Sequence, residues 1–187
     1  MTSSLTAGAT AVALANMRLI SGDSVSLADA ERLVAPDHVN HEAHNEPVEC
    51  RQEGPLGLLA TRHWLRSAFG SLAFEILDVA EAGELVAVRC EMHVRHTGDF
   101  VVCDAAGDVK EAFPPTGREA VIGQTHWFTI RDGQATEHRA NRDDLGMATQ
   151  LGWVPPKPAY LVGMAIAKRR VRRAIAAGTA PWQASFS

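Results

Sequence analysis

The chain has 187 residues, of which 46% are hydrophobic and 21% charged, and its net charge is −4. This length fits one well-cored domain with at most an added helix or tail, and the acidic balance excludes an overall field that would recruit nucleic acid. No window approaches the roughly 18 consecutive apolar residues of a membrane span, and no Lys or Arg precedes the apolar stretch within residues 1–15, so we expect neither a membrane partner nor a secretory signal.

Apolar residues at helical spacing dominate the first part of the chain. They predict helices over residues 6–20, 27–35 and 56–69, with an irregular segment over residues 38–47. The first helix ends at Gly22, and the second must end near Pro36 because proline cannot continue a helix.

The period then changes to the alternation of strands. We expect strands over residues 72–80, 85–96, 121–131 and 134–143, and a long loop over 98–118. A short helix over 144–151 and a basic helix over 159–177 complete the chain. Helices followed by an antiparallel sheet predict an α+β fold, with the helices packed across one face of the sheet.

Asp132-Gly133 lies between two β-rich runs, which is a strong signal for a two-residue type I′ hairpin turn. Closure of that turn would pair Phe128 with Glu137, His126 with Arg139, Gln124 with Asn141 and Ile122 with Asp143. One face of the sheet would then carry the polar groups Gln124, His126, Arg139, Asn141 and Asp143. This concentration of proton-carrying groups predicts a lined pocket rather than a dry core.

Several motifs, in order along the chain, resemble the SnoaL-like polyketide cyclases, also called ester cyclases. They are Val39-Asn40-His41, Val86-Ala87-Val88-Arg89, His96-Thr97-Gly98-Asp99-Phe100, Pro114-Pro115-Thr116-Gly117-Arg118, Arg131-Asp132-Gly133, Glu137-His138, and Asp143-Asp144-Leu145-Gly146 through Gln150-Leu151-Gly152. The resemblance implies the cystatin-like fold of nuclear transport factor two: a cone-shaped barrel of curved antiparallel sheet with N-terminal helices on its concave face. It implies a cone domain over residues 1–153, outside which lie the basic helix and tail of residues 154–187.

The resemblance also implies chemistry and partners. Asp143 matches the aspartate that acts as acid/base in an intramolecular aldol condensation, and Gln124 and His126 match a glutamine and a histidine on the preceding strand. Such a reaction acts on a small aromatic or hydrophobic substrate and needs no metal and no cofactor. A homodimer is the usual assembly of the superfamily. The long loop and the basic helix depart from the common pattern.

A carboxylate can start this reaction if an apolar cavity raises its pKa towards neutrality. Ile122, Phe128, Trp64 and Leu65 are candidates to line such a cavity, and His126 or Gln124 could hydrogen-bond the developing oxyanion. Arg139 could bind a ligand oxygen or pair with Glu137. His41 and His96, which lie in the family motifs, are further candidates for substrate binding.

Each of these residues also has a purely structural interpretation. Asp143 could be the N-cap of the helix that follows, His126 a satisfied buried histidine, Gln124 and Asn141 a cross-strand amide pair, His41 and His96 structural histidines, and Trp64 a packing residue. The spacing of His38, His41 and His44 could suggest zinc, but carboxylate or cysteine partners at ligand spacing are missing.

The sequence is also compatible with other functions. Arg139, Asn141 and Asp143 could imitate part of the Asp-Arg-Asp site of a limonene-type epoxide hydrolase, although the one tyrosine, Tyr160, lies beyond the cone domain. A non-catalytic ligand-binding or dimerisation module is the third possibility. The basic run 168–173 is interpreted as a solvated helix face or a contact with a second subunit. Three cysteines without CxxC spacing favour a cytoplasmic protein with reduced thiols.

Overall fold

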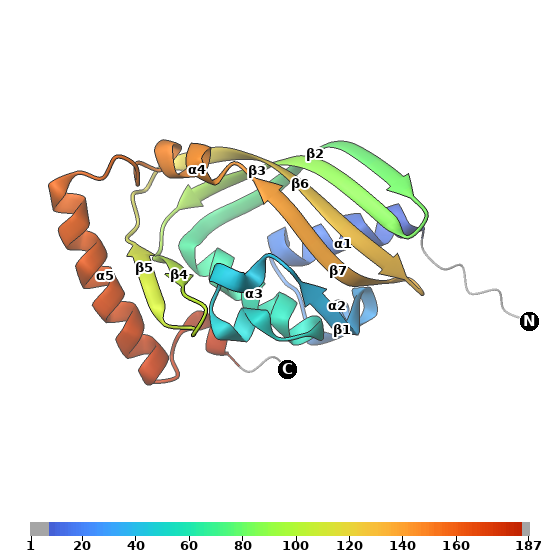
Figure 1. Ribbon diagram of the computed structural model, residues 1–187, viewed down its shortest axis with the longest axis horizontal. Coiled ribbons are helices and arrows are strands. Elements are labelled where there is room, and N and C mark those ends of the chain that lie inside the picture. Colours follow the sequence, from blue (N-terminus) through green and yellow to red (C-terminus); the bar gives the residue numbers. More distant parts are fainter. Residues whose placement is uncertain (1–7, 185–187) are drawn as a thin grey trace, which may run out of the picture.

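A computed structural model describes residues 8–184 of the chain (Figure 1). Its helices are α1 (Ala9–Ser21), α2 (Leu27–Leu33), α3 (Gly54–Ala68), α4 (Asp144–Gln150) and α5 (Pro158–Ala176), with 3-10 turns η1 (Ala43–Asn45), η2 (Val48–Arg51) and η3 (Pro181–Gln183). Its strands are β1 (Val34–Asn40), β2 (Phe69–Ala82), β3 (Leu85–His96), β4 (Phe100–Cys103), β5 (Val109–Phe113), β6 (Glu119–Arg131) and β7 (Gln134–Arg142). Residues 6 and 7 of the first predicted helix lie outside the described residues.

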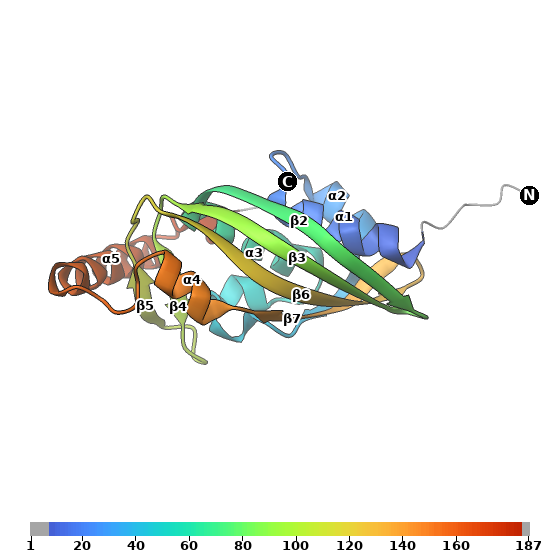
Figure 2. The same cartoon turned by 90° about the horizontal axis from the view of Figure 1, so that it is seen from above.

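The larger sheet has the strand order β1-β7-β6-β3-β2 and is antiparallel except where β1 runs parallel to β7. Figures 1 and 2 show this sheet curving over α1, α2 and α3, which all lie against one of its faces. The α+β fold with a curved sheet and N-terminal helices on its concave face is therefore confirmed. No helix within residues 8–184 has the length and hydropathy needed to cross a bilayer.

Alternation along β3 places its apolar residues on the concave face, as predicted. The buried side chains of this strand are Val86, Val88, Cys90, Met92, Val94 and His96. They meet the inward residues of β6, which pair with them without a register shift. Helix α1 covers one end of this face through Val12, Ala13 and Met17. The hydrophobic core therefore lies between the sheet and the N-terminal helices.

A buried arginine joins the helices to one another. The guanidinium group of Arg62 in α3 donates hydrogen bonds to the carbonyl oxygens of Leu19, Ile20 and Asp23 at 2.9–3.2 Å. The carbonyls of Leu19 and Ile20 lie in the last turn of α1, where backbone acceptors lack partners within the helix, and that of Asp23 lies just beyond it. Arg62 therefore fixes α1 against α3, and with it one wall of the space beneath the sheet.

Two segments not predicted as strands are strands in the structure; the first takes in residues 34 and 35, which the prediction had placed at the end of the second helix. Residues 34–40 form β1 because the backbone of β7 offers a free edge, and Asn40 pairs with His138 there. The long loop over residues 98–118 contains the hairpin of β4 and β5, a separate two-stranded sheet. Sequence alternation was weak in both segments, and tertiary contacts decided their conformation.

The basic helix α5 packs against this second sheet, as the left part of Figure 1 shows. Its inward residues Ala167 and Val171 share a buried cluster with Trp64 of α3. The Tyr160 hydroxyl donates to the Pro114 carbonyl at 2.9 Å, and Arg170 forms an ion pair with Asp99 at 2.6 Å. Part of the basic run therefore serves the packing of α5.

The predicted turn between β6 and β7 is present, but the predicted register is wrong beyond it. Asp132 and Gly133 both have positive φ, at 49° and 79°, as a type I′ turn requires. A bulge then inserts Thr136, so that Ile130 pairs with Ala135 but Thr129 pairs with Glu137. One extra residue exchanges the two faces of every later position of β7.

Deletion of Thr136 tests this register. Removing the extra residue would turn Arg139 and Asn141 into the buried face and His138 and Ala140 out of it. We expect a loss of about 4 kcal/mol or more in the free energy of unfolding, or no folded protein, because buried charge without a partner is costly. Urea unfolding followed by circular dichroism measures the change.

Thr136→Ala is the control because it keeps the residue count. It removes only the hydrogen bond from the Thr136 hydroxyl to the Thr129 carbonyl, so we expect a change of about 1 kcal/mol or less. A deletion variant as stable as this control would contradict a register fixed by the bulge.

Candidate functional site

Two joined hollows lie beneath the sheet, between β3, β6 and β7 on one side and α1, α3 and the segment after β1 on the other. Their volumes are about 90 Å³ and about 230 Å³. Residues that line both hollows mark the junction: Glu42, Glu46, Leu65, Met92, Gln124 and Arg142. The combined space reaches the lower end of the ~300–1,000 Å³ range of small-molecule sites. We call the smaller part the polar hollow and the larger part the aromatic hollow.

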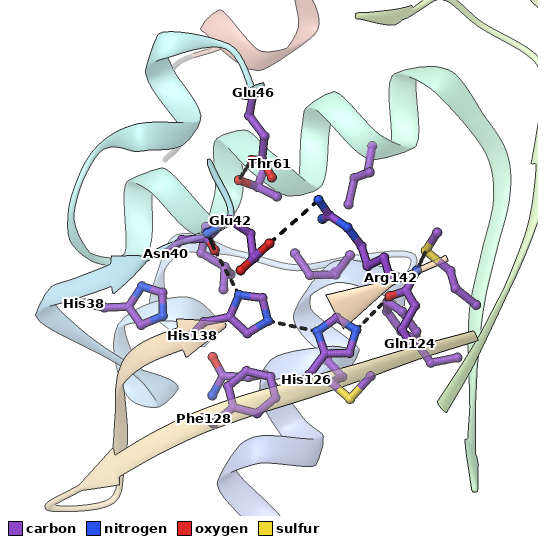
Figure 3. Close-up of a pocket in the computed structure, with 17 residues that line it drawn as sticks. His38, Asn40, Glu42, Glu46, Thr61, Gln124, His126, Phe128, His138 and Arg142 are labelled. Carbon is purple, nitrogen blue, oxygen red and sulfur yellow. Dashed lines mark hydrogen bonds and ion pairs between the residues drawn. The ribbon is translucent and has the colours of Figure 1, made fainter. Parts of the chain in front are cut away.

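A row of hydrogen-bonded side chains crosses the polar hollow (Figure 3). Asn40 Oδ1 lies 2.9 Å from His138 Nδ1, and His138 Nε2 lies 2.9 Å from His126 Nδ1. His126 Nε2 lies 2.8 Å from Oε1 of the Gln124 side-chain amide. The row therefore runs across three neighbouring strands, from β1 through β7 to β6.

Chemistry fixes the direction of the proton donors in this row. Asn40 Oδ1 also accepts a hydrogen bond from the Glu42 backbone N–H, so it is an oxygen, and His138 must donate to it through Nδ1. A neutral His138 then accepts at Nε2, and His126 donates to it through Nδ1–H. The lone pair of a neutral His126 is left at Nε2, on the side of Gln124.

Both orientations of the Gln124 amide are useful to this histidine. In the structure the amide oxygen faces His126 Nε2, where it accepts from a protonated His126; after a half turn of the amide its NH₂ group donates to neutral His126. The other contact of the Gln124 amide is a weak one, 3.6 Å to the sulfur of Met92, so a half turn of the amide breaks little. Gln124 can therefore accommodate both protonation states of His126.

Burial keeps the histidines of the polar hollow neutral. Burial and then the charge of Arg142 lower the pKa of His126, which is 8% exposed, to about 4. Burial and then His126 lower the pKa of half-buried His138. Burial likewise lowers the pKa of His38 to about 4, and its Nε2 lacks a hydrogen-bond partner among the described residues. Neutral imidazoles are the form that can accept a proton.

A carboxyl group and a guanidinium group stand at the junction of the hollows. Glu46 is 4% exposed and accepts a hydrogen bond from the Thr61 hydroxyl at 2.7 Å. Burial raises the pKa of Glu46. Arg142 lies between two other acids, 4.0 Å from Glu42 and 3.6 Å from Asp144. The junction thus offers one buried acid and one cation to a ligand.

Aromatic rings form the walls of the larger hollow. They are Trp64, Phe69, Phe100, Phe113 and Trp153. Trp153 stacks on Phe113 with ring centroids 4.4 Å apart, and Trp64 donates from Nε1 to the Val101 carbonyl, which fixes its ring. Rigid apolar walls of this kind suit a flat, apolar ligand.

The structure brings together only some of the predicted site residues. Gln124, His126 and Phe128 line the polar hollow, and Trp64 lines the aromatic hollow. His126 pairs with Ala140 rather than Arg139, and Gln124 with Arg142 rather than Asn141. His138 and Arg142, which the predicted register had placed on the outer face of β7, therefore line the cavity.

Asp143, Asn141 and Arg139 lie on the other face of β7 or at its end. Asp143 is exposed, and its carboxylate accepts from the backbone N–H of Gly146 at 2.8 Å as the N-cap of α4. Asp143 and Asn141 line a shallow depression on the convex side of the sheet. Arg139 forms an ion pair with Glu137 at 2.8 Å. The structure does not place Asp143 beside His126.

The two motif histidines also lie away from the hollows. His41 is within 3.0 Å of Glu137, which it shares with Arg139, and this contact lowers the pKa of Glu137. His96 is fully buried between Phe69 and Trp153 and accepts from the Thr116 backbone N–H through Nδ1. Neither lines the polar or the aromatic hollow.

Sequence reasoning missed the residues that complete the site: Asn40, Glu46, Thr61, His138 and Arg142. Asn40 and His138 do stand in two of the family motifs, but Glu46 and Thr61 carry no local signal because a loop and a helix bring them together. A group with metal-like spacing, formed by Glu75, Glu91 and His93, lies on the convex side of β2 and β3. It is remote from the row of histidines and solvent-facing, and exposed acidic groups of this kind are common without an ion.

The buried histidines predict a pH-dependent stability. Burial lowers the pKa values of His38, His96 and His126 from 6.5 to about 4. Between pH 4 and pH 6.5 these histidines are therefore protonated in the unfolded chain but neutral in the folded chain. The contribution of these histidines to the free energy of unfolding is therefore fully present above pH 6.5. It falls as the pH drops towards 4, by about 1.4 kcal/mol per pH unit for each histidine.

Urea unfolding at pH 7, 6 and 5 measures this loss. In His38→Leu we expect the free energy of unfolding to depend less steeply on pH, by the equivalent of one proton taken up on unfolding, because leucine has no group to protonate. A free energy of unfolding that stays constant from pH 7 to pH 5 would contradict neutral buried histidines.

Known proteins share this architecture. The family model for SnoaL-like polyketide cyclases matches residues 12–151. TsrD from Streptomyces laurentii is 20% identical, with a TM-score of 0.60 over 76% of this chain and 93% of that one. IdmH from Streptomyces antibioticus, provisionally described as a polyketide cyclase, is 26% identical, with a TM-score of 0.57 over 78% and 99% of the two chains.

A third solved structure covers more of the chain. AclR from Streptomyces galilaeus, provisionally described as a hydroxylase, is 19% identical, with a TM-score of 0.59 over 91% of this chain and 96% of that one. A comparison with curated proteins finds no match. The family match extends from α1 to the end of α4 and takes in the whole of the larger sheet, and it agrees with the resemblance seen in the motifs. The chain belongs to the SnoaL-like polyketide cyclase family.

Proposed function

We propose that this protein catalyses an aldol-type ring closure of a small aromatic or hydrophobic ester, by acid/base chemistry of the lyase or isomerase type and without a metal or cofactor. The observation that carries the proposal is the row Asn40–His138–His126–Gln124 at the edge of a mostly apolar cavity. Once the Gln124 amide moves away, the row directs the lone pair of neutral His126 at Nε2 towards an apolar substrate. Membership of the cyclase family supports this class of reaction.

In the proposed reaction His126 is the base. The substrate displaces the Gln124 amide from His126 Nε2, which then takes a proton from a C–H group acidified by neighbouring carbonyls. The electron pair left on carbon attacks a second carbonyl carbon of the same molecule and forms the ring C–C bond. The oxygen of that carbonyl becomes an alkoxide, which receives the proton back from His126, so no atom is gained or lost.

His138 and Asn40 are positioning residues in this scheme. His138 accepts from His126 Nδ1–H and shares the positive charge that forms when Nε2 is protonated. Asn40, held by the Glu42 backbone N–H, keeps His138 in the tautomer that can accept. A correctly oriented general base typically contributes about 10²–10⁴-fold to a rate.

The geometry removes the support for an epoxide hydrolase of the limonene type. That interpretation required Arg139, Asn141 and Asp143 to converge, and they lie on the convex side or at the end of β7, where they are exposed. A ligand-binding module without turnover uses the same cavity and is an outcome of the experiment below.

Substitution of His126 tests the proposed base. We expect His126→Asn to lower kcat by about 10²-fold or more on aromatic polyketide methyl esters, because the lone pair at Nε2 is lost. His93→Asn is the matched control, since His93 is a histidine on the solvent-facing side of β3. Binding of these esters without turnover by the wild type would favour the ligand-binding module.

Asp143→Asn separates the two candidate catalytic residues. Asn caps a helix about as well as Asp, so we expect wild-type stability and turnover close to wild type. The sequence-based assignment of Asp143 as acid/base expects turnover to collapse in the same variant. Steady-state kinetics on the same esters distinguishes the two results.

We also propose a cytoplasmic homodimer. Three buried free thiols support a reducing compartment, and burial raises the pKa of Cys90 and Cys103 to about 11. Exposed apolar side chains on the sheet, among them Leu77, Val79 and Val121, support association with a second copy. Light scattering on the purified protein tests the dimer, and a monomeric mass at micromolar concentration would rule it out.

A further inference from the structure

We propose that Glu46 is a second catalytic residue of this cavity, and that its protonated carboxyl group donates a hydrogen bond to the carbonyl oxygen of the substrate. The inference deepens the proposed ring closure and rests on it. It assigns the junction of the two hollows as the place where the reacting carbonyl lies, between the aromatic walls and the histidine row.

Burial and position support this role. Glu46 is 4% exposed and lines both hollows, so its carboxyl group faces ligand space rather than bulk water. Figure 3 shows it beside Thr61 of α3, across the polar hollow from His126. An acid on one side of a cavity and a base on the other can act on the same small molecule.

The hydrogen bond from Thr61 leaves one oxygen of Glu46 for the ligand. The Thr61 hydroxyl donates to Oε2 at 2.7 Å, which makes Oε2 the carbonyl-type acceptor of a protonated carboxyl group. Oε1 then carries the proton and can donate it into the cavity. Thr61 is thus a positioning residue for the Glu46 hydroxyl.

The charges around Glu46 do not hold it ionised. Within residues 8–184 no cation forms an ion pair with Glu46 within 4.0 Å. The charge of Arg142 on β7 does act on Glu46, but its guanidinium group lies closer to Glu42 and Asp144. The other groups that act on it are Glu42 and His44, and the Cys50 thiol of η2 is also near. Burial outweighs the opposing effects of Thr61 and Arg142 and raises the pKa of Glu46, which keeps it protonated to a higher pH.

A neutral carboxyl group suits the chemistry of this site. Removal of the C–H proton by His126 places negative charge on the carbonyl oxygen of the forming enolate, and a preorganised donor stabilises that charge. Glu46 would keep its proton throughout, so the acid donates a hydrogen bond while His126 alone moves the proton.

Difference infrared spectroscopy tests the protonation state without any substrate. The wild-type minus Glu46→Gln spectrum at pH 7 should contain the C=O stretching band of a protonated carboxyl group. Glu49→Gln is the matched control because Glu49 lies three residues on and lines neither hollow; it gives the difference spectrum of the same substitution outside the cavity. An ionised carboxylate signal for Glu46 would overturn the proposal, whatever the enzyme turns over.

Kinetics of three variants test the donor. Glu46→Gln keeps a donor of similar shape and should lose far less kcat than Glu46→Leu, for which we expect a loss of about 10²–10³-fold. Thr61→Val should lower kcat with little change in KM, because it loosens the orientation of the hydroxyl. Equal losses in the Gln and Leu variants would overturn the role of donor.

The pH profile of turnover gives a separate signature. The donor is present below the raised pKa of Glu46 and is lost above it, so wild-type kcat should fall on the alkaline side, and this limb should be missing in Glu46→Gln. An alkaline fall of kcat in both the wild type and Glu46→Gln would contradict the assignment of Glu46 as the donor. His126→Asn should lower turnover strongly but leave the infrared band of Glu46, so failure of the base and failure of the acid are distinguishable.

Discussion

The register between β6 and β7 is the constraint on which the rest of the site depends. A single extra residue, Thr136, decides that His138, Ala140 and Arg142 face the helices while Arg139 and Asn141 face solvent. Alternation along a strand permits only these two choices, so the bulge acts on every later side chain at once. The histidine pair exists because this exchange brings His138 to the side of the sheet that already holds His126.

Electrostatics explains why the cavity can hold so many polar groups. Burial penalises charge, and three buried groups that line the polar hollow, His126, His38 and Glu46, all have pKa values shifted towards their neutral forms. Neutral groups can be satisfied by single hydrogen bonds, as Gln124 and Thr61 provide. Before a reaction the buried groups of the site are therefore neutral, and their donors and acceptors can hydrogen-bond charge that develops on a ligand.

The β4–β5 hairpin and helix α5 act on the aromatic half of the cavity. The β4–β5 hairpin supplies Phe100 and Phe113, and α5 packs on the outer side of that hairpin and fixes it through Tyr160 and Arg170. The basic charges of α5 are thus partly used for packing, in agreement with the net negative charge of the chain. The size and shape of the aromatic hollow depend on these elements, whereas the histidine row depends on the larger sheet. The two halves of the cavity are therefore built by different parts of the chain.

The sequence by itself determined the helices, the strands β2, β3, β6 and β7 of the main sheet, the inward face of β3, the Asp132-Gly133 turn and the family. These features arise from local periodicity and turn chemistry, which neighbouring residues specify. Only the tertiary structure decided β1, the β4–β5 hairpin and the partners of His126 and Glu46. β1 became a strand because β7 offered it an edge, and Glu46 became a buried acid because α3 placed Thr61 against it. A bulge has no fixed sequence signature, so the face of Asp143 could not be predicted by counting residues from the turn.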